Sequence, residues 1–154
     1  MQTEVRPARP DDVAALRWLE EEARADVALR RGGPQLLADH PLIGDGWVDA
    51  VGTQPARVLI ATIDDVAVGY LVLSPLVAGG TGRVQQVWVS PGAREVGFGD
   101  DLLLSAMQLA RRAGAVAIEG EALPGDRETK NLYERAGVTA RKIIVWKALE
   151  ATGE

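Results

Sequence analysis

The chain has 154 residues, 47 % of them hydrophobic and 25 % charged, and this length predicts a single domain over residues 1–154. Its formal net charge of −5 argues against non-specific nucleic-acid binding. It has no cysteine, which excludes disulfides, thiolate metal sites and cysteine nucleophiles, and its single histidine, His40, cannot form a metal cluster alone. Because no apolar run could span a bilayer and the first residues lack signal-peptide character, we expect a cytoplasmic protein without membrane contact.

The first half of the chain predicts a strand, a long helix and an irregular segment. Residues 3–7 are typical of a short strand, and Pro10-Asp11-Asp12 is a favourable helix start because proline and acids suit the first turn. Apolar residues recur every three or four positions to about Leu29, after which cations, two glycines and a proline end the helix. Residues 34–56 are less regular and favour short helices.

The second half predicts a hairpin followed by two strand–helix units and a last strand. Such an order is typical of a mixed sheet covered by helices, so we predict an α/β fold of the α+β mixed-sheet kind. The expected segments are strands at 57–63, 66–76 and 83–89, a helix from about 99 to 112, a strand at 116–123, a helix at 127–136 and a strand at 139–149.

The most informative stretch is Arg94-Glu95-Val96-Gly97-Phe98-Gly99, between a predicted strand and a predicted helix. Such a turn aims backbone N–H groups and the positive end of a helix dipole at one point, where an anion such as a pyrophosphate can bind. Side chains at Gly97 and Gly99 would keep the anion away from those groups. The stretch is not a P-loop, because no Gly-Lys-Ser/Thr follows, and it matches a dinucleotide fingerprint poorly.

This Arg-x-x-Gly-x-Gly pattern resembles the acetyl-CoA signature of the GNAT acetyltransferase superfamily. The order of elements over about residues 3–149 is similar too, as are Val5-Arg6-Pro7-Ala8, the hairpin from Asp64 to Tyr70 and the segment from Leu132 to Val138. The resemblance implies a GNAT-like fold and an N-acetyltransferase that moves the acetyl group of acetyl-CoA to a primary amine of a small molecule or a peptide amino terminus. Without a cysteine to carry the acyl group, the amine would attack directly in a ternary complex.

The same resemblance implies where the cofactor binds. Backbone groups of the strand at 83–89 would pair with the pantetheine arm, at the point where two neighbouring strands splay apart. Asp126 stands where relatives often have asparagine. Arg127 or Lys130 would reach the 3′-phosphate. Asp126 is also a good helix N-cap. The acids at 95, 100 and 101 would repel a pyrophosphate and weaken its binding. The candidate cofactor-binding residues are Val87, Trp88, Val89, Arg94, Glu95, Val96, Gly97, Phe98, Gly99, Asp126 and Lys130.

The resemblance implies that Tyr133 donates a proton to the departing CoA sulfur; the pKa of a phenol lies above that of a thiol, so the phenol is protonated when the thiolate forms. A tyrosine that only packs its ring against the sheet is the alternative. Many relatives carry a glutamate as general base at the position of Arg83. Glu121, or Glu119 on the same strand face, is the replacement candidate, acting through a water; a solvated or salt-bridged glutamate is the alternative. His40 is another candidate base.

A second hypothesis belongs to a different class of protein. The arginine at position 83 and the acidic turn favour a non-catalytic acyl-CoA-binding or interaction domain that kept the fold and lost the chemistry. An intact Tyr133 and glycine pair favour the enzyme, and a fold that binds no CoA at all is the third reading. The last strand, or the face that carries Trp146, is a route to a homodimer.

Overall fold

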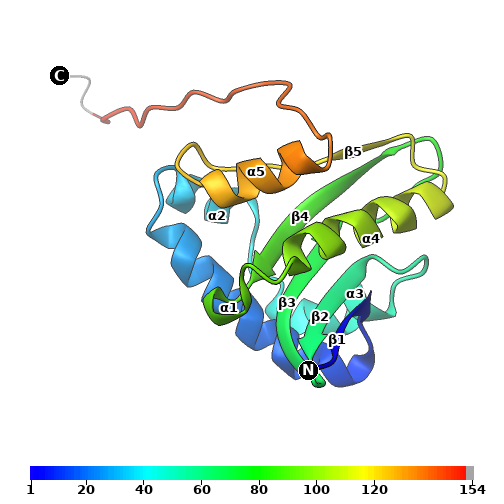
Figure 1. The fold of residues 1–154 in the computed structure, drawn as a ribbon. Helices are drawn as coiled ribbons and strands as arrows, with labels where there is room; N and C mark the ends of the chain where they lie inside the picture. Colours follow the sequence, from blue (N-terminus) through cyan, green and yellow to red (C-terminus); the bar gives the residue numbers. More distant parts are fainter. Residues whose placement is uncertain (152–154) are drawn as a thin grey trace.

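A five-stranded sheet organises the computed structural model, which describes residues 1–151 (Figure 1). Its strands lie in the order β1-β2-β3-β4-β5, each antiparallel to its neighbour except for β4 and β5, which are parallel. The mixed sheet that the sequence predicts is therefore confirmed. The strands are β1 (Thr3–Pro7), β2 (Val58–Ile63), β3 (Val66–Leu73), β4 (Thr81–Val89) and β5 (Ala117–Glu119).

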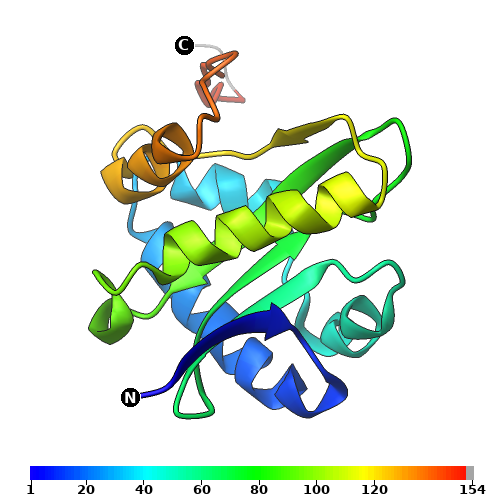
Figure 2. The same ribbon diagram turned by 45° about the vertical axis from the view of Figure 1, so that its right-hand side comes forward.

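Helices cover both faces of the sheet (Figure 2). On one face α4 and α5 pack through Leu102 and Leu132 against the apolar side chains of β2 and β3; on the other, α1 and α3 pack through Leu16 and Trp47. Within residues 1–151 no helix is long and apolar enough to cross a membrane. The helices are α1 (Val13–Ala28), α2 (Gly33–Asp39), α3 (Trp47–Gly52), α4 (Phe98–Arg112) and α5 (Arg127–Arg135), with 3₁₀ turns η1 (Pro10–Asp12), η2 (Gly44–Gly46) and η3 (Pro91–Ala93).

The last predicted strand, over residues 139–149, is wrong. Residues 138–150 adopt neither helix nor strand, and the apolar side chains of Ile143, Ile144 and Val145 are 74–89 % exposed. A strand is stable only when a neighbour completes its hydrogen bonds, and no strand of the sheet pairs with this segment. Two other predicted strands are shorter than expected: the one at 66–76 ends at Leu73, and the one at 116–123 is restricted to Ala117–Glu119.

The two parallel strands separate after a short contact. Thr81, Gly82 and Arg83 of β4 pair with the three residues of β5, but β4 continues to Val89 without a partner on that side. The edge of β4 from Val84 to Val89 is therefore open in the middle of the molecule. This divergence positions the candidate site described below.

A buried carboxylate, Glu20, connects α1 to the segment before α3 and to β4. Its side chain is fully buried and accepts hydrogen bonds from the backbone N–H groups of Ile43 and Gly44, from Trp47 Nε1 and from Gln86 Nε2, at 2.9–3.0 Å. Buried carboxylates are tolerated only with such full hydrogen bonding. Glu20 thereby fixes the irregular segment against the sheet.

Replacing Glu20 by alanine is expected to destabilise the protein by about 3–5 kcal/mol, because four buried or partly buried donors lose their acceptor at once. Chemical denaturation monitored by tryptophan fluorescence measures the change. Glu21→Ala is the matched control, because Glu21 is exposed on the same helix and should change stability by less than about 0.5 kcal/mol. Equal stability of the two variants would contradict this account of Glu20.

Candidate functional site

A cleft of about 610 Å³ lies between the diverging strands β4 and β5. Residues of α1, α2 and α5 line it, together with the turn before α4. The cleft brings together most of the sequence-predicted site residues, His40 included, but not Val96, Glu119, Arg127 or Lys130. The others that line it are Val87, Trp88, Val89, Arg94, Glu95, Gly97, Phe98, Gly99, Glu121, Asp126 and Tyr133.

The glycine-containing turn leads directly into α4. Glu95 and Gly97 both have left-handed backbones, with φ of 69° and 92°. Within residues 1–151, no hydrogen-bond acceptor meets the N–H groups of Gly97, Phe98, Gly99 or Asp100. Four unsatisfied donors at the positive end of a 15-residue helix can bind an anion, as the sequence predicts. A Cβ on Gly97 would meet no protein atom within 4 Å, so the glycine serves the backbone conformation rather than packing.

Val89 has its backbone groups on the open side of β4. The N–H of the next residue, Ser90, donates to Val68 O on β3, and backbone groups alternate sides along a strand. The N–H and carbonyl of Val89 therefore point away from β3, into the space between β4 and β5. The Trp88 side chain lies on the α1 face, where its Nε1 donates to Glu22 Oε1 at 2.8 Å.

Arg94 is held by the protein itself. Its Nε donates to Val89 O at 3.0 Å, its guanidinium lies 4.7 Å from the centre of the Trp88 ring, and its Nη1 is 3.0 Å from Glu128 Oε2. The arginine thus links the end of β4 to α5 across the cleft. Nearby, Asp100 is paired with Arg135 at 2.9 Å, which offsets one of the acids that the sequence places around the turn.

Tyr133 extends from α5 across the end of β5. Its side chain is 7 % exposed, and its hydroxyl lies so close to Gly120 that a Cβ there would overlap the oxygen. Burial raises the pKa of Tyr133 above its usual value, with smaller contributions in the same direction from Glu121 and Asp126. The phenol therefore stays protonated and can act as a proton donor, and Gly120 provides the space for it.

His40 and Glu121 form a pair that the sequence did not indicate. His40 follows α2, Glu121 follows β5, and His40 Nε2 lies 2.7 Å from Glu121 Oε1. Arg24 on α1 holds this histidine, since its Nη1 donates to the His40 carbonyl at 2.6 Å. His40 and Glu121 are separate candidates in the sequence, because 81 positions divide them and only the fold brings them together.

Other candidate residues have structural partners. Glu119 accepts hydrogen bonds from Arg141 and Arg83, which hold its pKa below the usual range, so the salt-bridged alternative is correct for this residue. Asp126 caps α5, accepting from the N–H and hydroxyl of Thr129. Lys130 Nζ donates to Pro124 O at 3.0 Å, at the start of the turn that precedes α5.

The sequence did not indicate a hydrogen-bonded polar group in the cleft, which consists of Tyr70, Gln86 and the buried Glu20. The Tyr70 hydroxyl donates to Gln86 Oε1 at 2.5 Å, and Gln86 donates in turn to the buried Glu20. Tyr70 and Gln86 both line the cleft. In the sequence, Gln86 is one of several polar residues on β4 and Tyr70 is an aromatic residue on an apolar strand, and neither pattern identifies a site.

Comparisons with known proteins agree with this geometry. The model of the Acetyltransferase (GNAT) family matches residues 15–138. No curated protein sequence matches the chain. This chain belongs to the Acetyltransferase (GNAT) family.

Solved structures of acetyltransferases share the fold. The aminoglycoside acetyltransferase AAC(6')-Iy, in complex with a bisubstrate analogue of CoA, is 16 % identical over 98 % of this chain and 100 % of its own, with a TM-score of 0.70. The PaiA N-acetyltransferase from Thermoplasma acidophilum, in complex with coenzyme A, is 14 % identical over 88 % and 89 % of the two chains, with a TM-score of 0.71. The ribosomal-protein-alanine N-acetyltransferase from Brucella melitensis biovar Abortus 2308 is 16 % identical over 97 % and 99 %, with a TM-score of 0.66.

Replacing Gly120 by alanine should displace the Tyr133 ring and destabilise the protein by about 1–3 kcal/mol, because the added methyl overlaps the buried phenol. Thermal denaturation measures the loss. Gly125→Ala is the control, since a Cβ at Gly125 meets no atom within 4 Å and should leave the melting temperature nearly unchanged. If both variants melt together, the Tyr133 side chain does not occupy the position described.

Proposed function

We propose that this chain transfers an acetyl group from acetyl-CoA to a primary amine by direct attack in a ternary complex. The observation that carries the proposal is the opening between β4 and β5, where the edge of one strand, an anion-binding turn, a buried phenol and a His–Glu pair surround a single cleft. Each group fits one requirement of acyl transfer.

The residues present fit coenzyme A. The N–H groups of Gly97 to Asp100 would hold the pyrophosphate at the start of α4, and the open edge of β4 would pair with the amides of the pantetheine arm. The cofactor supplies an activated thioester. The N–H of Val89 points into the cleft and would donate to the thioester carbonyl, which stabilises the negative charge that develops on that oxygen.

His40 and Glu121 would accept the proton of the attacking amine. When neutral His40 donates its Nε2–H to the glutamate, its other ring nitrogen stays free to take a proton, directly or through a water. Glu121 then stabilises the imidazolium that forms. This pair replaces the missing glutamate at position 83, where Arg83 instead pairs with Glu119.

Tyr133 would protonate the sulfur as the thioester bond breaks. Attack of the amine on the carbonyl carbon forms the C–N bond, and cleavage of the C–S bond releases the thiolate of CoA. The phenol would donate a hydrogen bond and then its proton to that sulfur, and its raised pKa keeps it protonated until the thiolate forms. Because a buried tyrosine is a weaker acid than a thiol, this transfer is uphill by itself and is completed when the phenoxide regains a proton from solvent.

The acceptor we infer is a cationic amine of a small molecule or the amino terminus of a peptide. Acidic side chains outnumber arginines in the lining of the cleft, although Arg30 pairs with Asp26 and Arg94 pairs with Glu128. The net charge of the chain is −5. Both features favour a positively charged partner. Two structures that share this fold are enzymes for aminoglycosides and for the alanine of a ribosomal protein, which fits either acceptor class.

Tyr133→Phe is expected to lower kcat by about 10²–10⁴-fold while leaving the affinity for acetyl-CoA within about twofold, because only the proton donor is removed. Thiol release with a panel of polyamines, aminoglycosides and short peptides measures kcat, and calorimetry measures binding.

The same assay tests the proposed base and the alternative function. His40→Gln should lower kcat by about 10²–10⁴-fold, since the glutamine amide cannot accept the proton of the attacking amine. Unchanged turnover in Tyr133→Phe would exclude its role as acid. Saturable CoA binding without turnover on any amine in the wild-type protein would favour a non-catalytic acyl-CoA-binding domain.

Gly97→Trp is expected to weaken acetyl-CoA binding at least about tenfold, because the indole would cover the N–H groups at the start of α4. Gly137→Trp is the matched control: both glycines have a left-handed φ, of 92° and 79°, and neither would place a Cβ within 4 Å of another group. Titration with acetyl-CoA and with adenosine diphosphate compares them. Equal affinities in the two variants would rule out the turn as the phosphate site.

A further inference from the structure

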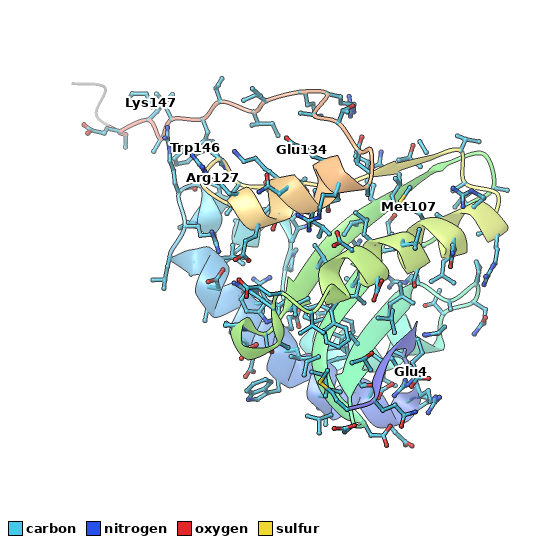
Figure 3. All side chains as sticks on the ribbon, in the orientation of Figure 1. Glu4, Met107, Arg127, Glu134, Trp146 and Lys147 are labelled. Atoms are coloured by element: carbon cyan, nitrogen blue, oxygen red, sulfur yellow. The ribbon has the colours of Figure 1, made fainter. Side chains whose placement is uncertain are left out.

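Glu20 is a buried charge that the proposed reaction does not use. Within residues 1–151 it is the one charged residue that is buried, whereas Figure 3 shows Glu4, Arg127 and Glu134 on the outside of the molecule. All four hydrogen-bond partners of Glu20 are neutral N–H donors, and a carboxyl group that only accepts hydrogen bonds is ionised. A charge in the interior acts strongly on the polar groups beside it.

Gln86 connects this charge to the cleft. Its Nε2 donates to Glu20 Oε2 at 2.9 Å, and its Oε1 accepts from the Tyr70 hydroxyl at 2.5 Å. Gln86 lines the cleft and is only partly buried. A carboxamide has two N–H donors and two acceptor lone pairs, of which Glu20 and Tyr70 use one each. One N–H and one lone pair of Oε1 therefore remain available to a ligand in the cleft.

The carboxamide of Gln86 is fixed in one orientation. Burial raises the pKa of Tyr70 above its usual value, and the charge of Glu20 acts in the same direction, so the hydroxyl stays protonated and donates. Turning the amide over would bring its oxygen against the Glu20 carboxylate, and two acceptors repel each other. A polar group that is already held in place binds a ligand without the entropic cost of ordering it.

Helix α1 anchors both Gln86 and the proposed base. Glu20 and Arg24 lie one turn apart on this helix and therefore project from the same side of it. Glu20 holds Gln86, and Arg24 Nη1 donates to the His40 carbonyl at 2.6 Å. Gln86 and His40 both line the cleft. An amine that gives its proton to His40 is therefore on the same side of the cleft as Gln86.

The charge of Glu20 favours a hydrogen-bond donor as the ligand of Gln86. Arg24, one turn away, donates to the carbonyls of His40 and Leu37 rather than to this carboxylate. The carboxylate polarises the amide through the N–H that it accepts, which makes Gln86 Oε1 a better acceptor. An amine, and still more an ammonium group, is the ligand chemistry that fits such an oxygen.

We propose that Gln86 Oε1 accepts a hydrogen bond from the amine of the acceptor, and that Glu20 and Tyr70 are the positioning residues that orient its carboxamide. The inference rests on the proposed function, because it assigns the acceptor end of the same cleft. Tyr133 acts on the departing sulfur, whereas Gln86 sets the affinity for the amine. Loss of Gln86 therefore changes the KM of the acceptor and leaves the binding of acetyl-CoA unchanged.

Gln86→Met tests the contact, because methionine keeps the length of the side chain and removes the amide. Steady-state kinetics should show the acceptor KM raised at least about tenfold, with the affinity for acetyl-CoA within about twofold by calorimetry. Gln85→Met is the matched control, since Gln85 is exposed and lines the same cleft without the contacts to Glu20 and Tyr70. Its acceptor KM should stay within about twofold of the unchanged protein.

Tyr70→Phe tests the positioning role, since it removes only the hydroxyl that holds Gln86 Oε1. We expect the acceptor KM to rise about 3–10-fold while kcat stays within about twofold. The chain has two tyrosines, and the same substitution at the other, Tyr133→Phe, lowers kcat instead. A purely structural Tyr70 would lower the melting temperature and leave the acceptor KM unchanged, which would overturn its assignment. This variant also carries the test if Gln86→Met does not fold.

Binding without turnover separates this inference from the proposed function. Calorimetric titration of the CoA-bound protein with spermidine, neomycin and trialanine measures acceptor affinity in the absence of any chemistry. If the unchanged protein binds one of these amines but never acetylates it, the proposed function fails, and a weaker affinity in Gln86→Met still supports the inference. Equal amine affinity in the unchanged protein and Gln86→Met, or no amine binding by the unchanged protein, would overturn it.

Discussion

The separation of β4 from β5 is the constraint on which the rest of the structure depends. Backbone N–H and C=O groups in the interior of a protein must find hydrogen-bond partners. A strand edge that is open inside the molecule leaves a row of these groups available to a ligand that enters the cleft. Here β4 runs six residues beyond its last pair with β5. A ligand with amides of its own can complete that edge, so the opening defines both a cleft and the chemistry of what fits it.

The surrounding elements hold this opening apart. Arg94 joins the end of β4 to α5 through Val89, Trp88 and Glu128, and the buried Glu20 fixes the floor of the cleft from the other side. Neither residue has to contact a substrate to affect the geometry of the cleft. Both keep the walls at a fixed distance, which is the condition for reacting groups to meet in a productive geometry.

The acid and base of the proposed reaction come from different environments. Tyr133 lies in a buried position that keeps its phenol neutral, whereas His40 and Glu121 are partly exposed at the mouth of the cleft. Separating a proton donor from a proton acceptor in this way lets one cleft take a proton from the amine and deliver another to the sulfur.

The sequence by itself determined the local features: the hairpin of β2 and β3, the glycine turn before α4, the cap at Asp126 and the mixed-sheet class. Each of these rests on residues close together in the chain, where periodicity, backbone freedom and capping act directly. Only the tertiary structure decided the pairing of His40 with Glu121, the space that Gly120 leaves for Tyr133 and the salt bridges of Glu119. It also decided that residues 139–149 form no strand, because a strand depends on a partner edge and not on its own residues alone.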